Sequence, residues 1–521
     1  MKKFMPKATF KRYDQGQMMV LPPSLDELIS QDHLVRIVDR TLEEMDLSSL
    51  YDQYKGGGTS SYDPKMLLKV IVYAYSLKIY SGRKIARALR QDVTFMWMSG
   101  MNRPDFRTIN LFRSGVLKKT IEQIFSSMLM FLVEKEYVSF ENYFVDGTDI
   151  QADANKRKVV WKKNAIRYKE IADQKLKQLF DKIDQIDEEE NRKYGDNDLE
   201  ETGATSQVTD EQIKEHAAKI NKILEEVSNK KDNRQGEKLK KEIKLQQEKR
   251  NKYQQQIDLS DERSGFSITD TDATVMRTKT DELRPAYNVM IGTENQMIVN
   301  YSIHQNPSDT ANLISHLEQL DKYTDKKPKN MMGDAAFGSE ENYDALEQRD
   351  IGNYLKYNTF HLEQTKKQKQ NRFHKDNFHY VEKEDYYICP NDKHLPFSHK
   401  ENHKTKTNYV IERKVYECEN CTRCPFAKEC KKTDKNRRIY VSEKFERFKQ
   451  QARDNLTSEK GIELRKQRGI EDESVFGDIK RNQSFGRFHL KGKGKVKTEF
   501  GIVSIAHNLR KVHLKLIKKA A

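Results

Sequence analysis

Two apolar segments that each reach an aspartate constrain the fold more than any other feature of this sequence. Residues 141–152, ENYFVDGTDIQA, are aromatic and β-branched up to Asp146, and residues 329–339, KNMMGDAAFGS, reach Asp334 in the same way. Small residues follow both aspartates, which indicates two buried strands with a carboxylate at the end of each. Strand ends collect at one edge of an open sheet, so the two carboxylates are predicted to converge in an α/β fold.

Other segments supply the remaining sheet and its helices. The stretches TDATVMRTK, YNVMIGT and QMIVNYSIH alternate or run apolar, and the last two are joined at GTENQ as a predicted hairpin. Amphipathic spacing predicts helices at 308–320, after Asp334 in ENYDALEQRD, near 443, at 460–480 and at 497–516.

The stretch GIEDESVFGDIK, residues 469–480, brings a third carboxylate to this sheet edge. Helical spacing puts Glu473, Phe476 and Lys480 on one face, with Glu473 expected on the inner side; Glu471 and Asp472 are rivals in the same window. Three converging carboxylates repel one another unless divalent cations lie between them, and hard oxygen ligands suit Mg²⁺ or Mn²⁺. Two such ions activate an attacking oxygen and stabilise a leaving one, which is the chemistry of cutting and joining DNA. Lys480 is then expected against a phosphate.

The N-terminal region, residues 1–135, is predicted to be mostly helical. PKMLLKVIVYAYSLKIY, residues 64–80, is too apolar all round for a surface helix. The next predicted helix, which Ser81 can cap, carries Arg83, Arg87 and Arg90. These arginines fit a helix-turn-helix bundle and equally an ordinary solvated face.

From Lys156 to about Ile257 the chain is highly charged and nearly free of aromatics after Phe180. Two runs with 4-3-4-3 apolar spacing are separated by a polar loop, and Thr209 with Gln212 forms a predicted capping box. Two heptad runs joined by a loop predict a protruding antiparallel helical hairpin.

Four of the five cysteines lie in CENCTRCPFAKEC, and the fifth opens CPNDKHL. Their spacing suits tetrahedral thiolate ligation of a structural zinc ion. The expected ligands are Cys389, Cys421, Cys424 and Cys430, with Cys418 as the substitute. The two-residue spacing of Cys418, Cys421 and Cys424 also leaves an iron–sulfur cluster open.

The net charge and the lengths of the apolar runs limit the classes of partner that this chain is expected to bind. Lys plus Arg outnumber Asp plus Glu by 95 to 80, giving a net charge of +15 and a sequence pI near 9.2. This balance favours a polyanionic partner, of which nucleic acid is the commonest. The basic start lacks the apolar run of a signal peptide, and the longest apolar stretch is about half a membrane span. We therefore expect a soluble cytoplasmic protein with no membrane partner.

Four segments together resemble a bacterial insertion-sequence DDE transposase: YFVDGTDIQADANK, TDTDATVMRTK, NMMGDAAFGSEENY and RGIEDESVFGDIKRNQSFGRFHLKGKGKVKTEFGIVSIAHNLRK. The similarity is greatest to the eleven-eighty-two group, which is related to the larger four and five groups. LPPSLDELISQDHLVRIVDR and the cysteine-bearing pieces also resemble that group, so the resemblance runs over nearly the whole chain.

The resemblance implies an RNase H-like fold in which Asp146, Asp334 and Glu473 hold two Mg²⁺ or Mn²⁺ ions. It implies a DNA-binding helical domain at 1–135 and a catalytic domain at 136–521, with a helical-hairpin insertion at 156–257 and a cysteine-bearing insertion at 340–460. The family places an arginine four residues before the glutamate, whereas this chain has Gly469 there and Arg468 one residue earlier. The expected DNA contacts are Lys480, Arg468, Arg487, Arg83, Arg87 and Arg90.

The implied activity is metal-dependent strand cleavage and strand transfer at the element ends, by a homodimer in a synaptic complex associated with the bacterial nucleoid. The alternatives are a non-catalytic, domesticated DNA-binding protein with a structural zinc site, and a structural RNA-binding protein supported by charge alone. Metal-dependent nicking of DNA ends would separate the enzyme from both.

Overall fold

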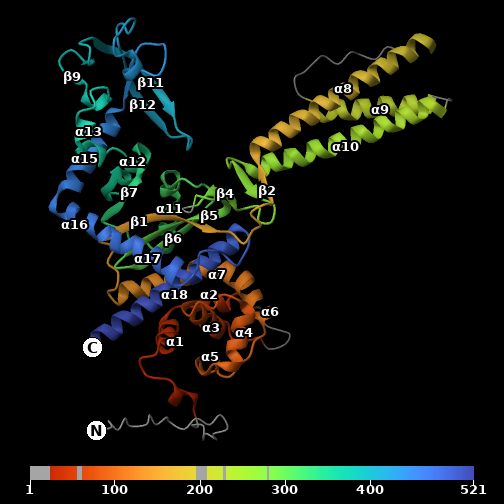
Figure 1. Ribbon diagram of the computed structural model, residues 1–521. Coiled ribbons are helices and arrows are strands. Elements are labelled where there is room, and N and C mark those ends of the chain that lie inside the picture. The colour runs from red at the N-terminus through yellow and green to blue at the C-terminus, as the bar shows by residue number, and fades with distance from the viewer. Residues whose placement is uncertain (1–23, 55–60, 195–207, 227–229, 279–280, 521) are drawn as a thin grey trace, which may run out of the picture.

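The computed structural model describes residues 24–54, 61–194, 208–226, 230–278 and 281–520 (Figure 1). A central mixed sheet carries a helical unit on one side, a long helical arm at one end and a smaller second sheet at the other (Figure 1).

The N-terminal unit is helical, as predicted. Its elements are a 3-10 turn at Leu25–Leu28, α1 (Leu34–Glu44), α2 (Ser48–Tyr51), α3 (Pro64–Ser76), α4 (Gly82–Gln91), α5 (Val93–Met98), α6 (Phe106–Leu111), a π-helical turn at Phe112–Val116 and α7 (Leu117–Glu134). Asp63 caps α3 by accepting from the N–H of Met66, with Pro64 in the first turn. From Leu67 to its end α3 is buried, and its apolar side chains belong to the same core cluster as those of the sheet.

The central sheet has eight strands: β1 (Asn142–Gln151), β2 (Val159–Trp161), β3 (Gly265–Ser267), β4 (Thr274–Arg277), β5 (Leu283–Glu294), β6 (Met297–His304), β7 (Asn330–Gly338) and β8 (Gly352–Tyr357). Its order is β2-β3-β4-β5-β1-β7-β8, and β6 also pairs with β5. β5 runs antiparallel to β1 and β6, whereas β7 is parallel to both β1 and β8. The predicted β5–β6 hairpin is confirmed, and its turn residues Asn295 and Gln296 have positive φ.

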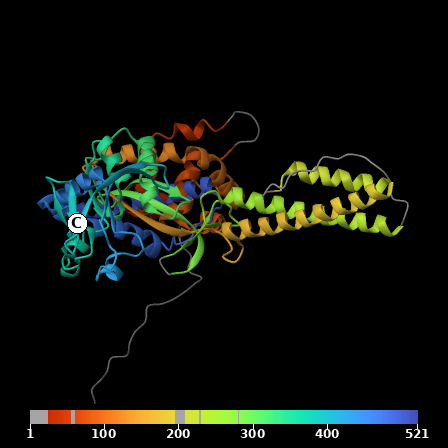
Figure 2. The ribbon, with the colours of Figure 1, turned by 90° about the horizontal axis from the view of Figure 1, so that it is seen from above.

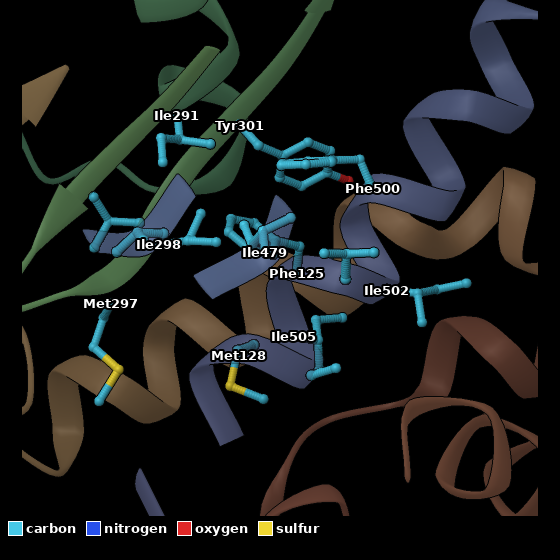
Figure 3. Close-up of a cluster of buried hydrophobic side chains, with 14 of the residues drawn as sticks. Phe125, Met128, Ile291, Met297, Ile298, Tyr301, Ile479, Phe500, Ile502 and Ile505 are labelled. Carbon is cyan, nitrogen blue, oxygen red and sulfur yellow. The ribbon is translucent and has the colours of Figure 1, made fainter. Parts of the chain in front are cut away.

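Helices α11 (Asp309–Tyr323), α12 (Glu340–Gln348) and α18 (Lys493–Ala520) pack on this sheet. The ring of Tyr301 on β6 contacts the rings of Phe125 on α7 and Phe500 on α18. Figure 3 shows Ile479 in this same apolar cluster. The segment that carries Glu473 and Lys480 is therefore anchored in the core by Ile479, which is fully buried.

The charged region forms an arm that projects away from the sheet in both views (Figures 1 and 2). It consists of α8 (Lys162–Tyr194), α9 (Asp210–Glu226) and α10 (Lys230–Ser260), which share an apolar cluster separate from the main core. The capping box is confirmed, since Thr209 and Gln212 exchange side-chain hydrogen bonds with each other's N–H at 3.1 and 3.2 Å. The two predicted heptad runs are α8 and α9, and α10 is a third helix that the heptad pattern missed.

A second sheet follows β8, in the order β13-β12-β11-β10-β9, all antiparallel. Its strands are β9 (His379–Val381), β10 (Tyr386–Ile388), β11 (His394–Lys404), β12 (Val410–Glu417) and β13 (Arg438–Val441), with short helical turns at Leu362–Gln364, Lys366–Lys369 (α13), Lys375–Asn377 and Ala427–Cys430 (α14). Strand β10, in YYICP, does not pair directly with β12, in RKVYEC. β11 lies between β10 and β12, because a long hairpin leaves after Cys389 and returns before Cys418.

The C-terminal part of the chain returns to the central sheet. It contains α15 (Glu443–Thr457), α16 (Glu459–Arg468), a π-helical turn at Gly469–Glu473, α17 (Ser474–Gly477), a second π-helical turn at Asp478–Asn482, and α18. No helix in the described ranges is both long and apolar enough to span a membrane.

Candidate functional site

Asp146 and Asp334 lie on neighbouring parallel strands. β1 and β7 pair with Val145 opposite Gly333, so the residue after each partner is one of the two aspartates. Asp146 is 9% exposed. Asp334 is half-buried, and one of its oxygens accepts from the N–H of Ala336 at 2.9 Å. The strands therefore place the two carboxylates side by side, although 188 residues separate them in sequence.

One guanidinium contacts both carboxylates. A terminal nitrogen of Arg468, the last residue of α16, lies 3.9 Å from Oδ1 of Asp146 and 3.8 Å from Oδ2 of Asp334. These distances allow charge attraction without a hydrogen bond. The space between the two aspartates thus already accepts a positive charge, which is what a pair of nearby carboxylates requires. The prediction that each aspartate ends its strand was wrong, because β1 continues to Gln151 and β7 to Gly338.

Glu473 lies differently from the expectation. Its side chain is exposed, whereas Glu471 and Asp472 are buried, so the prediction that Glu473 occupies the inner face was wrong. The reason is the π-helical turn at Gly469–Glu473, which rotates the following residues relative to a regular helix. Glu473 remains within electrostatic reach of Lys356, as does Asp334.

The two buried acids bind the β5–β6 hairpin. Asp472 is fully buried and accepts a hydrogen bond from Thr293 at 2.8 Å, while Glu471 accepts from the N–H of Gln296 at 2.6 Å. Burial, with the nearby Asp146 carboxylate, raises the pKa of Asp472 well above its usual range. These contacts clamp the π-helical turn to the sheet beside Asp146.

Lys480 lies against β1, beyond Asp146. Its ammonium donates to Oγ1 of Thr148 at 2.6 Å and to the carbonyl of Asp149 at 2.5 Å. Thr148 is two residues from Asp146, so both side chains leave the same face of the strand. Lys480 therefore fixes the second π-helical turn against the strand that carries Asp146.

The carboxylates fit a metal site only in part. Their oxygens are hard donors of the kind that Mg²⁺ prefers, and Arg468 shows that positive charge is accommodated between two of them. Yet among the residues that the structure describes, no group of three or more His, Cys, Asp or Glu side chains is arranged to hold a metal ion. Asp146 and Asp334 are brought together, and Glu473 does not join them.

The cysteines gather at the end of the second sheet. Cys418 and Cys421 are buried in one apolar cluster, and Cys389 and Cys430 pack against it. Cys424 lies close enough to influence Cys430 electrostatically. The sulfurs of Cys389 and Cys421 each accept from a backbone N–H, at 3.4 and 3.3 Å. Burial raises the pKa of the Cys418 thiol, and a hydrogen bond with the Cys421 side chain raises it further; both cysteines are free thiols.

The arginines expected on DNA are on the surface. Arg83, Arg87 and Arg90 are all exposed on α4, with Arg83 stacked 4.9 Å from the ring centre of Phe106. Arg487 follows the second π-helical turn and pairs with Asp153 at 2.6 Å. Exposure is what phosphate contact needs, but it is equally what an ordinary solvated face shows.

Two basic residues of this region were not expected from the sequence: Lys356 on β8, which lies near Asp334, and Arg465 on α16, which lies near Lys356. Burial, Arg468 and Arg465 lower the pKa of Lys356 below its usual range. A signal was available: Lys356 stands between Leu355 and Tyr357 in the strand GNYLKY, where an unpaired charge is costly.

The comparison with protein families found two matches. A family model described as Transposase DDE domain matches residues 388–513, and one described as Transposase domain (DUF772) matches residues 23–115. The first covers Glu473 and Lys480 but begins after both aspartates. Neither the curated proteins nor the solved structures yielded a match. The two family matches support an insertion-sequence transposase family and a transposase function; they do not address the eleven-eighty-two group.

Proposed function

We propose that this protein is the DNA transposase of an insertion sequence, which binds the element ends and catalyses metal-dependent strand cleavage and strand transfer. The observation that carries the proposal is that Arg468 contacts both Asp146 and Asp334. Two distant aspartates and the segment leading to Glu473 thus meet at one point of the sheet. That segment lies in the part of the chain matched by the DDE-domain family.

The strand order supports an RNase H-like core. β6, β5 and β1 form an antiparallel meander, and β7 and β8 extend it in parallel on the other side of β1. β1 and β7 supply the two aspartates, as in the DDE arrangement that the sequence resembles.

In the proposed mechanism Asp146, Asp334 and Glu473 hold two divalent cations. When bound, such ions activate the attacking oxygen and stabilise the leaving oxygen of an in-line displacement at phosphorus. Asp472 and Glu471 hold the π-helical turn on the sheet, and Lys480 fixes the chain against β1. Arg468 and the exposed arginines of α4 bind the DNA backbone, which supplies most of the affinity.

The test is cleavage of DNA that carries the inverted repeats flanking this gene. We expect nicking at the repeat ends in Mg²⁺ or Mn²⁺ and none with a chelator. Replacing Asp146 or Asp334 by Asn removes a ligand, so the cleavage rate should fall by about 10³-fold or more, equivalent to about 4 kcal/mol of transition-state stabilisation. Duplex binding should persist.

The matched control is Asp321→Asn, because Asp321 is surface-exposed and paired with Arg349 away from these strands. Unchanged cleavage by both aspartate variants would reject the proposed site. A wild-type protein that binds the repeats without nicking them would reject the enzyme.

A second candidate is a non-catalytic DNA-binding protein with a structural zinc ion. It is favoured by the separation of Glu473 from the aspartate pair. For either candidate, the proposed zinc ligands are Cys389, Cys421, Cys424 and Cys430. Three of them belong to or pack against one apolar cluster, although no three described cysteines are arranged to hold a metal ion. A homodimer in the synaptic complex and a nucleoid location are further parts of the transposase proposal.

A further inference from the structure

A cluster of three basic side chains lies beside the aspartate pair. Lys356 projects from β8, while Arg465 and Arg468 project from α16 one helical turn apart. We propose that Lys356 and Arg465, together with Arg468, bind a backbone phosphate of the DNA strand next to the phosphate that is cut. The inference rests on the proposed function and adds to it a phosphate-binding site formed by two residues that no motif marks.

Lys356 is held close to other positive charges without a partner of its own. Its side chain is half-buried, and within the described ranges it makes no hydrogen bond and no ion pair. Arg468 and Arg465 oppose its charge, and Asp334 and Glu473 offset this only in part. A lysine in a purely structural network would lie within ion-pair distance of a carboxylate, as Lys460 does at 3.3 Å from Glu141.

The two arginines have donors to spare. The Nε atoms of Arg465 and Arg468 are shielded from solvent and have no hydrogen-bond partner among the described residues. The guanidinium of Arg465 lies 5.6 Å from the ring centre of Phe360, which holds it in place without neutralising it. Leaving a charged donor shielded and unpaired costs free energy that an anion would recover.

The charge balance identifies the anion. Without metal, the carboxylates of Asp146, Asp334 and Glu473 face these cations. Once divalent ions occupy the carboxylates, the cations require negative charge from outside the protein. In an enzyme that cuts DNA, the phosphodiester backbone supplies it, and arginine matches phosphate geometry with two parallel bonds.

There is room for a strand beside the cluster. A cavity of about 400 Å³ adjoins Arg465 and is also lined by Phe360, Lys369 and the ion pair of Arg453 with Glu363. His361 lies near Lys356 and Arg465 as well, and burial together with those two charges lowers its pKa. Lys369 and Arg465 therefore both line the space in which the strand would lie.

The experiment measures duplex binding as a function of salt by fluorescence anisotropy. An Asp334→Asn background prevents cleavage and frees the cluster from one carboxylate. In that background, Lys356→Gln and Arg465→Gln should each reduce the slope of log affinity against log salt by about 0.9, the release expected for one phosphate contact. The affinity at 0.1 M salt should fall about eightfold, taking 1 M salt as the reference. Lys356→Arg should retain the slope.

Lys460→Gln is the matched control, because Lys460 lies on α16 with Arg465 but already pairs with the carboxylate of Glu141. Equal slopes for Lys356→Gln, Arg465→Gln and Lys460→Gln would overturn the inference. Selective competition by inorganic phosphate at matched ionic strength, lost on replacing Lys356, would assign the site to a free anion and overturn the strand assignment.

The salt-dependence experiment tests the phosphate site separately from the proposed transposase activity. A wild-type protein that nicks DNA while these slopes stay unchanged refutes this inference alone. A wild-type protein that never nicks DNA, but whose slopes change as described, retains the phosphate site and loses the enzyme.

Discussion

Glu499 is the charged group whose loss should most weaken the attachment of the N-terminal helical unit to the rest of the molecule. It lies on α18, is fully buried, and accepts from the N–H groups of His489 and Leu490 at 2.9 and 3.0 Å. Its other oxygen accepts from the hydroxyl of Tyr75 on α3 at 3.1 Å. That hydroxyl in turn accepts from Arg113 at 2.8 Å. The chain of bonds joins α3 to α18.

The magnitude follows from counting the donors. Glu499→Ala leaves three donors without their acceptor, and each buried unpaired donor costs about 1–3 kcal/mol. His489 and Leu490 are partly open to water, so the lower end applies and the total is about 3–4 kcal/mol. Glu499→Gln keeps an acceptor for the two N–H groups but offers Tyr75 a donor, so its cost should be about 1 kcal/mol.

Trp97, on α5, provides a local probe. The chain has only two tryptophans, Trp97 and Trp161, so a Trp161→Phe background restricts the fluorescence signal to the N-terminal unit. Urea unfolding followed at Trp97 should give the order wild type, Glu499→Gln, Glu499→Ala, from most to least stable. Glu463→Ala on the exposed side of α16 serves as the control. A loss below about 1 kcal/mol for Glu499→Ala, or equal losses for both variants, would refute the reasoning.

Three further outcomes are expected. Metal analysis of the purified protein should find zinc at one ion per chain and a marked loss in Cys421→Ser; zinc-free wild type or a visible-absorbing cluster would contradict the assignment. His316 is fully buried, and burial lowers its pKa well below its usual value. Below pH 6.5 the unfolded chain therefore binds the extra proton, so stability should fall as pH falls, by up to about 1.4 kcal/mol per pH unit, and His316→Asn should flatten this slope although it is less stable at pH 7.5. Replacing residues 163–259 by a short Gly-Ser turn should leave the unfolding midpoint of the core nearly unchanged, since the arm has its own apolar cluster; loss of the folded core would show that the arm supports the sheet.

Much of the central fold could be predicted because its strands carry short-range signals. The segments around Asp146 and Asp334 are apolar on both faces and end in small residues, and both are strands of the central sheet. The hairpin at GTENQ was equally predictable, since Asn295 tolerates the left-handed backbone that a tight turn needs. The order of the strands could not be predicted from the sequence, because the pairing of β1 with both β5 and β7 depends on contacts between residues far apart in the chain.

The arm shows a different limit. The spacing of apolar residues predicts α8 and α9. In α10, Lys, Glu and Gln are so frequent that little apolar periodicity remains. This segment is a helix because Ile243 and Gln246 are buried against its partners and because its polar residues favour helix. In the second sheet, the long hairpin β11–β12 was hidden because β11, HLPFSHKENHK, is exposed nearly throughout and alternates too weakly to indicate a strand.

The position of Glu473 could not have been read from helical spacing, and the reason is local. A regular helix from 460 to 480 would have turned Glu473 toward the core. The chain instead makes two π-helical turns, at Gly469–Glu473 and Asp478–Asn482, on either side of a single α-helical turn. Each adds a residue to the turn and shifts every later side chain around the axis.

Two hydrogen bonds stabilise the first of these π-helical turns. Glu471 bonds the N–H of Gln296, and Asp472 bonds Thr293, so both acids are fixed on the β5–β6 hairpin while Glu473 is left at the surface. π-helical turns concentrate at functional sites, because the displaced residue is free of the regular pattern. If Glu473 is the third metal ligand, its side chain must turn toward Asp146 and Asp334, and Arg468 must leave the aspartate pair. The phosphate site at Lys356 and Arg465 then gives Arg468 an anion to move toward, which links metal binding to the capture of DNA.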